Sequence, residues 1–250
     1  MTPPDSHALS FGPSADRYDE VRPSYPPAAL IWALGTAPCR VVDLGAGTGI
    51  LGRVLLALGH EVVSVEPDAA MRRRLAQASP EAEALDGTAE SIPLPDGCVD
   101  AVVAGQAYHW FDTERAHPEI ARVLRDGGVF APVWNIRDES VPWVARLSEL
   151  LAEPPGDGRR GGRLRGAGFG PLFGPLASKT FGHQVPMTAD RLVALMSTRS
   201  YYLKATPQRR AEISDGIREL VAGMAEPFAL PYDSVIYRAR RSARTPSAGR

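Results

Sequence analysis

The sequence predicts an α/β fold: one Rossmann-like, mostly parallel sheet of seven strands, with helices on both faces and a small helical cap between the last two strands. Two observations carry this prediction. Over the first 135 residues, short apolar runs alternate with amphipathic segments, as in parallel strands joined by crossover helices. Late in the chain, two helical patterns lie between two strand patterns, where they would cover the edge of the sheet.

Seven short segments have strand character, and most of them are apolar runs bounded by polar or glycine residues. The segment around residue 83 is the weakest of the seven. The predicted strands are Arg40–Leu44, Glu61–Glu66, Ala82–Leu85, Val99–Gly105, Val129–Trp134, Ser178–Val185 and Tyr232–Arg240.

The helices between these strands have readable ends. Gly59 follows the first, Asp68 caps the second, and Gly127 with Gly128 would stop the third. A fourth helix follows Ser140 and has Pro142 in its first turn. The predicted ranges are Ile50–Leu58, Asp68–Ala78, Pro118–Leu124, the segment after Ser140, Thr188–Ser197 and Thr206–Met224.

The composition is that of a soluble globular protein, with 44% hydrophobic and 23% charged residues. Lysine and arginine total 28 against 29 acids, so the net charge of −1 gives no general field that attracts nucleic acid. Cys39 and Cys98 have no metal-ligand spacing around them and predict neither a disulfide framework nor a zinc site.

The chain shows no targeting or membrane signal. Its start, MTPPDSHALSFG, lacks the basic residues and apolar run of a secretory signal. No stretch approaches the roughly 18 consecutive apolar residues that a membrane span needs. We therefore expect a cytoplasmic protein that does not bind membranes, and the sequence leaves open whether it is a monomer or a homodimer.

The segment VVDLGAGTG, Val41–Gly49, has the features of a ligand-binding turn. Glycines let the backbone approach a ligand, and the unpaired N–H groups of the following helix attract a polar or anionic group. Such a turn alone is weak evidence, because dinucleotide enzymes and simple tight turns use glycine too. The next strand, EVVSVE, ends in Glu66, 19 residues after Gly47, where a carboxylate can bind both hydroxyls of a ribose.

These motifs resemble those of the class I S-adenosylmethionine methyltransferases, particularly the small-molecule group that includes the trans-aconitate methyltransferase-like proteins. DLGAGTG is similar to their first motif and VEPDAAM to their ribose segment. GTAESIPLPDGCVDAVV is similar to the adenine segment and fourth strand, and EIARVLRDGG to the helix before the fifth strand. Asp126 stands where the family often has proline before the two glycines, a change expected only to loosen a turn.

The resemblance implies that S-adenosyl-L-methionine is the cofactor, and it assigns residues to each part of that molecule. Asp43, Gly45, Ala46 and Gly47 would hold the methionine end, and Glu66 the ribose. Pro67 and Met71 would flank the adenine, whose edge would contact Thr88, Ala89 and Glu90. Gln106 and Ala107 would face the sulfonium.

The opening stretch FGPSADRYDEVRPSYP, Phe11–Pro26, also resembles this group, in which an N-terminal segment folds over the cofactor. Tyr18 and Arg22 are then candidate contacts to the cofactor carboxylate. The alternative is that these two side chains only anchor a surface segment through ring packing and a salt bridge.

The length and the element pattern predict one domain over residues 1–240, and the arginine, serine and proline of residues 241–250 predict a flexible tail. Residues 1–38 would form the cofactor-covering segment and a helix, 39–135 the cofactor-binding core, and 186–228 the cap. The stretch Pro154–Gly170, with seven glycines and four arginines, is expected to be a mobile surface loop.

The residues expected around the methyl acceptor follow the fourth and fifth strands, since ligands bind at the carboxyl ends of strands in open α/β sheets. His109, in QAYHWFD, is the candidate base, because an imidazole titrates near neutral pH. The alternative is a structural histidine that packs with Trp110. Trp134 and Arg137 leave the fifth strand, and Arg137 could bind a substrate carboxylate or pair with Asp138. Tyr201 and Tyr202 would hang from the cap over the pocket, or else be ordinary core aromatics.

Transfer from a sulfonium is an in-line displacement that depends chiefly on alignment, and we expect a small-molecule acceptor, with oxygen favoured. Two other functions stay open. A nucleic-acid methyltransferase could use the basic cluster GRRGGRLRG, Gly158–Gly166, to hold phosphates, although a solvated loop is favoured. A cofactor-binding module without activity would bind the cofactor but methylate nothing.

Overall fold

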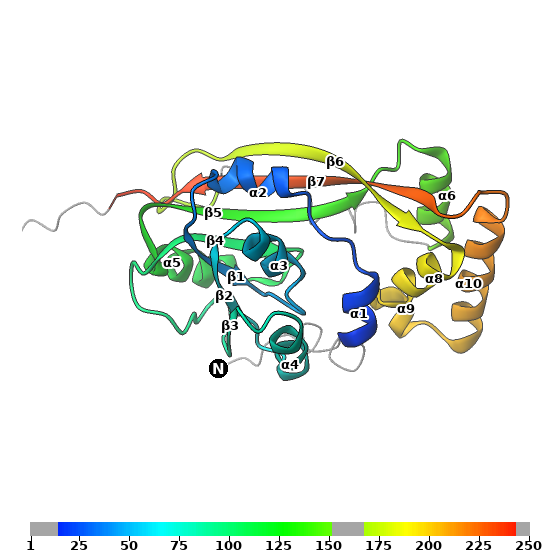
Figure 1. Cartoon of the computed structure of the whole chain (residues 1–250), viewed down its shortest axis with the longest axis horizontal. Helices are drawn as coiled ribbons and strands as arrows, with labels where there is room; N and C mark the ends of the chain where they lie inside the picture. The colour runs from blue at the N-terminus through cyan, green and yellow to red at the C-terminus, as the bar shows by residue number, and fades with distance from the viewer. Residues whose placement is uncertain (1–14, 152–167, 244–250) are drawn as a thin grey trace, which may run out of the picture.

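A computed structural model describes residues 15–151 and 168–243 of the chain. A seven-stranded sheet with strand order β3-β2-β1-β4-β5-β7-β6 runs through the molecule (Figure 1). Strands β1 to β5 pair in parallel, and β7 runs antiparallel to both of its neighbours, β5 and β6. The predicted Rossmann-like sheet, mostly parallel and with seven strands, is confirmed.

The strands largely follow the apolar runs of the sequence, and the last three are longer than predicted. They are β1 Arg40–Leu44, β2 Glu61–Val65, β3 Glu83–Leu85, β4 Val99–Gly105, β5 Leu124–Arg137, β6 Ala177–Met187 and β7 Phe228–Arg240. The carboxyl ends of β1, β2 and β4 lie at the same edge of the sheet, because these strands are parallel and in register. Loops that leave this edge can therefore build one site.

Helices cover both faces of the sheet. On one face, α2 Pro27–Leu34 and α3 Ile50–Ala57 pack on β1, β4 and β5, and α4 Ala69–Ala78 joins them through Leu75. On the other face, α5 Thr113–Val123 packs with a cluster of aromatic rings. These two apolar layers hold the sheet between them and leave its carboxyl edge for polar residues.

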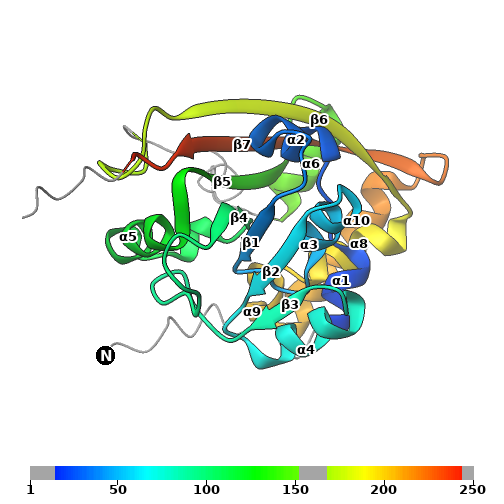
Figure 2. The same ribbon diagram turned by 60° about the vertical axis from the view of Figure 1, so that its left-hand side comes forward.

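The segments between β6 and β7 form a helical layer at one end of the molecule (Figures 1 and 2). It contains α8 Ala189–Ser197, α9 Ser200–Lys204 and α10 Pro207–Val221, and α6 Pro142–Leu150 packs against α10. Gly216 permits this approach, since a Cβ there would lie 2.7 Å from Leu150 Cδ1. This cap shares an apolar cluster with Val21 of α1, Ala15–Val21.

The predicted boundary between the fifth strand and its preceding helix is wrong. Asp112 caps α5 by accepting a hydrogen bond from the Glu114 N–H, so the helix starts at Thr113 and holds Pro118 inside it. It ends at Val123, and β5 starts at once. Gly127 and Gly128 therefore lie in a bulged start of β5, where a Cβ on Gly128 would come within 3.0 Å of Asp100 O.

Several predictions fall partly or wholly outside the described residues. They are the stretch Phe11–Ser14, most of the Pro154–Gly170 loop with its basic cluster, and the end of the 241–250 tail. The start of that tail is bonded, because the Arg241 N–H donates to Gly128 O and the Ser242 N–H donates to Leu172 O. Within the described residues, no helix is long and apolar enough to cross a bilayer.

Candidate functional site

The glycine turn after β1 adopts backbone angles that suit glycine. Gly45, Gly47 and Gly49 have φ of 69°, 58° and 83°, in the left-handed region that other residues avoid. A Cβ on Gly45 would lie 2.7 Å from the Cβ of Ala107, so this glycine lets the turn pack against the segment after β4. A Cβ on Gly47 would meet no atom within 4 Å, which leaves space beside that backbone for a ligand.

Glu66 follows β2 and lies beside the glycine turn. Its Oε2 accepts a hydrogen bond from Gly47 N–H at 2.8 Å, and its Oε1 accepts one from Asp68 N–H at 2.9 Å. Burial raises the pKa of Glu66, and these two N–H bonds partly offset that rise. Each carboxylate oxygen keeps a second lone-pair direction, so the group is oriented by the backbone and still able to accept hydrogen bonds from a diol.

Asp43 is fully buried at the end of β1, opposite Ser64 of β2. Burial, with a smaller contribution from the Glu66 charge, raises the pKa of Asp43 to about 7, and a backbone contact from Gly52 offsets the rise only in part. An acid with such a pKa is easily ionised by a nearby cation. Asp43 is therefore suited to respond to a positively charged ligand group.

The predicted adenine contacts are distributed around the ends of β2 and β3. Met71 lies buried in α4, and Pro67 lies directly after Glu66. Thr88 forms an isolated bridge with Ser91. Two of these residues already have protein partners: Ala89 packs in the hydrophobic core, and Glu90 Oε1 accepts the Asp112 N–H at 2.9 Å.

Arg22 links the N-terminal segment to the cap. Its guanidinium lies 4.4 Å from the Tyr18 ring centroid. Nε donates to the Thr198 hydroxyl and Nη2 donates to the Thr198 carbonyl, both at 3.0 Å. Burial and the nearby charge of Arg199 lower the pKa of Arg22 to about 10, so it remains a cation at neutral pH. Within the described residues, no carboxylate forms an ion pair with either arginine.

Tyr25 brings the N-terminal segment to the end of β4. A Cβ on Gly105 would lie 2.7 Å from the Tyr25 hydroxyl, so only glycine allows this approach. Burial raises the pKa of Tyr25, and the charges of Asp43, Arg22 and Arg199 all act on it. Among the described residues, no hydrogen-bond partner for this hydroxyl is present. Sequence reasoning missed Tyr25, although it stands three residues after Arg22.

The chain turns sharply after β4 at Gln106, the only described residue other than glycine with a positive φ, 55°. Its side-chain amide donates to Asn135 O at 3.0 Å. The Asn135 amide in turn donates to Ser24 O at 3.0 Å and accepts from the Ser234 hydroxyl. These bonds join β4, β5, β7 and the N-terminal segment around the site.

The residues predicted to bind the acceptor lie in two different environments. His109 and Trp110 form part of a short 3-10 helix after β4 and are exposed, with ring centroids 4.8 Å apart. Trp134 is 2% exposed and packs edge-to-face with Tyr108 and Tyr237. Trp134 therefore packs in the hydrophobic core in addition to any contact with a ligand.

Arg137 and Tyr201 meet at the cap. Arg137 is buried at the end of β5, where Nη2 donates to the Ser148 hydroxyl of α6 at 3.2 Å and Nη1 contacts Met196 Sδ at 3.7 Å. The Tyr201 hydroxyl donates to the same sulfur at 3.5 Å. The structure thus brings the end of β5 and the inner side of α8 and α9 together.

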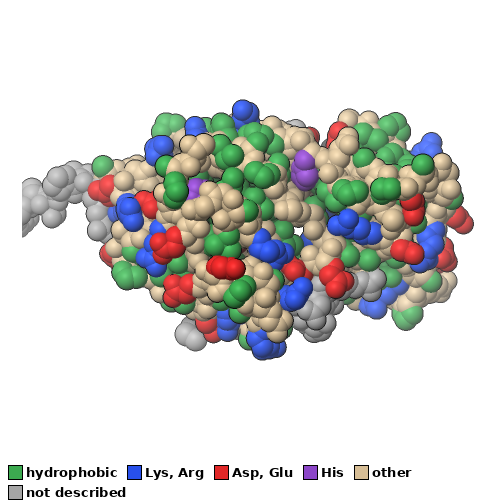
Figure 3. All heavy atoms as spheres, viewed as in Figure 1, with side chains coloured by type: hydrophobic (Ala, Val, Ile, Leu, Met, Phe, Trp, Pro, Cys, Tyr) green, Lys and Arg blue, Asp and Glu red, His purple; other side chains and the backbone are tan. Residues whose placement is uncertain are grey.

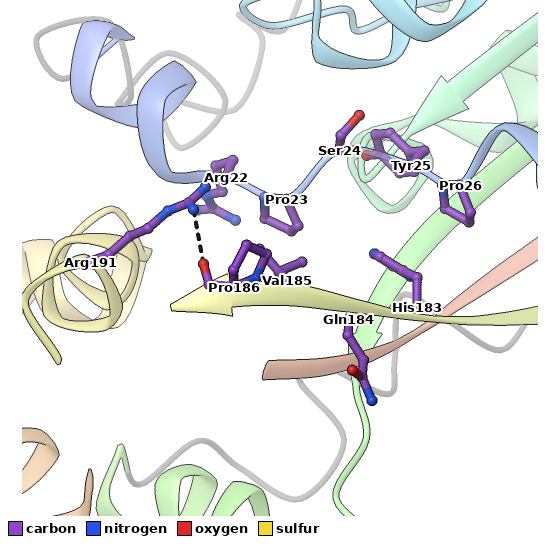
Figure 4. Close-up of a pocket in the computed structure, with 10 residues that line it drawn as sticks. All are labelled: Arg22, Pro23, Ser24, Tyr25, Pro26, His183, Gln184, Val185, Pro186 and Arg191. Atoms are coloured by element: carbon purple, nitrogen blue, oxygen red, sulfur yellow. Dashed lines mark hydrogen bonds between the residues drawn. The ribbon is translucent and has the colours of Figure 1, made fainter. Parts of the chain in front are cut away.

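A cavity of about 320 Å³ lies between residues 22–26 and β6 (Figure 4). His183 of β6 and Arg191 of α8 line it, and Arg191 Nη1 donates to Pro186 O at 2.9 Å. Tyr25 also lines this cavity. Arg22 lines the cavity as well, so the cavity shares two residues with the candidate site.

The fold and the site together define a Rossmann-like protein in which a buried carboxylate after β2 lies beside a glycine turn with space for a ligand. The evidence is the open space beside Gly47 and the Glu66 carboxylate bonded to that same residue. A sugar diol next to an amino-acid moiety fits this arrangement.

Comparison with known proteins identifies the family. Residues 42–131 match the methyltransferase domain model. An uncharacterized methyltransferase of Mycobacterium tuberculosis is 42% identical over 241 residues, which are 93% of this chain and 96% of that protein. The structure of a candidate type II methyltransferase from Anaeromyxobacter dehalogenans is 27% identical, with a TM-score of 0.66 over 89% of this chain and 99% of that chain. The chain belongs to the S-adenosylmethionine-dependent methyltransferases.

A more distant relative has a named acceptor. The malonyl-[acyl-carrier protein] O-methyltransferase of Methylococcus capsulatus is 37% identical over 136 residues, which cover 49% of each chain. The family model and the relative from Mycobacterium tuberculosis confirm the methyltransferase family and, with it, the cofactor expected from the sequence. The trans-aconitate-like subgroup is not among these findings.

Proposed function

We propose that this methyltransferase transfers the methyl group of S-adenosyl-L-methionine to an oxygen, of a hydroxyl or a carboxylate, on a small acceptor that carries an acidic group. The observation that supports it best is the pair of cations Arg22 and Arg199, whose charges act on each other and on the Tyr25 hydroxyl, while no described carboxylate forms an ion pair with either arginine. Cations held away from water are costly unless an anion pairs with them. A bound ligand can supply that anion.

The cofactor carboxylate balances one of these cations, and we assign it to Arg22, which Tyr18 supports through its ring. Arg199, at the junction of α8 and α9, is left for the acceptor. Arg137 lies buried at the end of β5 and adds a third positive charge on the side of the cap. An acidic acceptor would be attracted to this edge of the sheet and oriented there.

Alignment is the main task of the protein in this reaction. The cofactor would supply a methyl group on a positively charged sulfur: as the acceptor atom forms its bond to the methyl carbon, the carbon–sulfur bond on the opposite side would break and the sulfur would leave as a neutral thioether. Glu66 fixes the ribose, the glycine turn fixes the amino-acid end, and Gly105 with Tyr25 bounds the space at the end of β4. Good alignment can contribute on the order of 7 to 11 kcal/mol to lowering the barrier.

His109 is the proposed base for a hydroxyl acceptor. It lies exposed after β4, at the carboxyl edge of the sheet, beside the exposed Trp110. A carboxylate acceptor is already ionised at neutral pH and needs no base. The dependence of the rate on His109 therefore distinguishes the two kinds of oxygen.

Two further observations favour a small acid over a nucleic acid. The relative from Methylococcus is named as an O-methyltransferase of malonyl-[acyl-carrier protein], and a malonyl group carries a free carboxylate. On the face shown in Figure 3, basic and acidic side chains are interspersed, and the total charge is −1. A phosphate backbone is usually bound by a continuous basic surface.

Methyl transfer from labelled cofactor to matched acceptors tests the proposal. The panel contains small carboxylic acids, hydroxy acids and the corresponding primary amides. We expect turnover with acids and a KM for the acid that rises at least tenfold in Arg199→Gln. Arg218→Gln is the matched control, because Arg218 is an exposed arginine of the same cap that pairs with Asp190 and Asp215 at the surface. Equal turnover of acids and amides would refute an acidic acceptor.

A further inference from the structure

Asp19, a carboxylate of α1, is not among the predicted site residues and has no part in the proposed reaction. Its side chain is 9% exposed. Its Oδ1 accepts a hydrogen bond from the Thr48 hydroxyl at 2.7 Å and one from Arg53 Nη2 at 2.6 Å, and its Oδ2 accepts one from Arg74 Nη2 at 3.2 Å. These donors belong to the glycine turn, α3 and α4.

Thr48 connects this cluster directly to the glycine turn. It stands between Gly47 and Gly49 and is 1% exposed. Arg53 holds the same residue from its other side, since its Nη1 donates to Thr48 O at 2.9 Å. Asp19 and Arg53 therefore fix both the side chain and the carbonyl of the residue next to Gly47, whose N–H orients Glu66.

The C-terminal end of α1 is bound to the cap. Val21 belongs to the apolar cluster of the cap, and Arg22 donates to Thr198 at the end of α8. Figure 2 shows α1 lying next to both α4 and α8, which agrees with its contacts. One short helix thus joins the two sides between which the cofactor is placed.

A helix of seven residues is not stable by itself in water, so α1 is held by its contacts. The Asp19 cluster is the polar part of these contacts. Two arginines and a hydroxyl around one nearly buried carboxylate give charge-assisted hydrogen bonds, which are stronger than neutral ones. The Asp19 carboxylate therefore contributes to holding α1 against the core.

We infer that Asp19 is a positioning residue that latches α1 onto the cofactor-binding turn and so sets how fast the cofactor leaves. Asp19 acts through Thr48 and α1 and touches neither substrate. The inference rests on the proposed placement of the cofactor between the glycine turn and Glu66. Closing α1 keeps Tyr18 and Arg22 over that place, and opening it removes them.

Stopped-flow measurement of S-adenosylhomocysteine release tests the latch on the full chain. We expect Asp19→Asn to release the ligand about tenfold faster or more, because hydrogen bonds to charged groups are lost. Glu20→Gln is the matched control, since Glu20 is an exposed acid on the same helix. Thr48→Val removes only one donor of the cluster and should give a smaller increase.

A merely structural role makes a different prediction. It would lower the melting temperature of Asp19→Asn and leave the release rate unchanged, and this result would overturn the latch. The latch predicts a higher KM for the cofactor, an unchanged KM for the acceptor and partial recovery in Asp19→Glu. If Asp19→Asn does not fold, the release rate of Thr48→Val decides. Failure of the unaltered protein to bind S-adenosylhomocysteine would instead refute the placement of the cofactor.

Discussion

Glu66 gives the sharpest test of the cofactor site, because its carboxylate is already oriented by two backbone N–H groups at 2.8 and 2.9 Å. Glu66→Ala removes the acceptor proposed for both ribose hydroxyls. The cost of leaving such polar partners unmade is about 1 to 3 kcal/mol. Cofactor affinity should therefore fall by about 5- to 150-fold.

Titration calorimetry with S-adenosylhomocysteine measures this loss. Glu61→Ala is a matched control, because Glu61 begins the same strand at its other end, is exposed and pairs only with Arg40 at the surface. We expect no change of affinity in that variant. Glu66→Ala should also lower the melting temperature without ligand, since Gly47 N–H and Asp68 N–H lose their acceptor. An affinity equal to that of the unaltered protein would refute the ribose assignment.

Three further predictions concern single side chains. Burial raises the pKa of Asp43 to about 7, so between pH 3.9 and 7 the folded state holds a proton that the unfolded chain, with a pKa of about 3.9, has released. The free energy of unfolding therefore falls as the pH rises between these two values. In denaturation experiments at pH 4 and pH 8, Asp43→Asn should be more stable than the unaltered protein only at pH 8. His109→Ala should slow turnover of a hydroxyl acceptor by about 10² to 10⁴ with unchanged cofactor affinity, and an unaltered pH profile of kcat would make His109 structural. Tyr25→Phe should leave the melting temperature unchanged, because no described group bonds the hydroxyl, and should raise the acceptor KM severalfold; a lower melting temperature with normal kinetics would contradict this role.

Much of the fold could be predicted because each local signal agreed with the packing. Parallel strands such as β1 and β2 are apolar on both faces, so they read as short Val-rich runs. The caps also carried information, since Asp68 caps α4 by accepting the N–H groups of Ala70 and Met71. These features depend on neighbours in sequence and need no knowledge of distant contacts.

The boundary errors came from residues whose role is set by distant neighbours. Gly127 and Gly128 look like a helix stop, yet Gly128 is required because Asp100 O of β4 lies close to it. Pro118 looks like a helix start, but Asp112 already supplies the cap. Sequence reasoning cannot separate these cases without the pairing of β4 with β5.

The candidate site was predictable only where it follows the strands. Gly45, Gly47 and Glu66 come directly after β1 and β2, and the structure brings them together. Asp19, Tyr25 and Arg199 were missed because each acquires its position from a part of the chain that is remote in sequence, such as Gly105 for Tyr25. Residues of the N-terminal segment and the cap carry no strand-end signal that marks them.

The most direct test of the central claim is a crystal structure of the chain with S-adenosylhomocysteine bound. We predict that the Glu66 carboxylate accepts both ribose hydroxyls while the homocysteine lies along Gly45, Ala46 and Gly47, with its carboxylate at Arg22. A ligand bound elsewhere, or a ribose whose hydroxyls contact water in place of Glu66, would contradict the site described above.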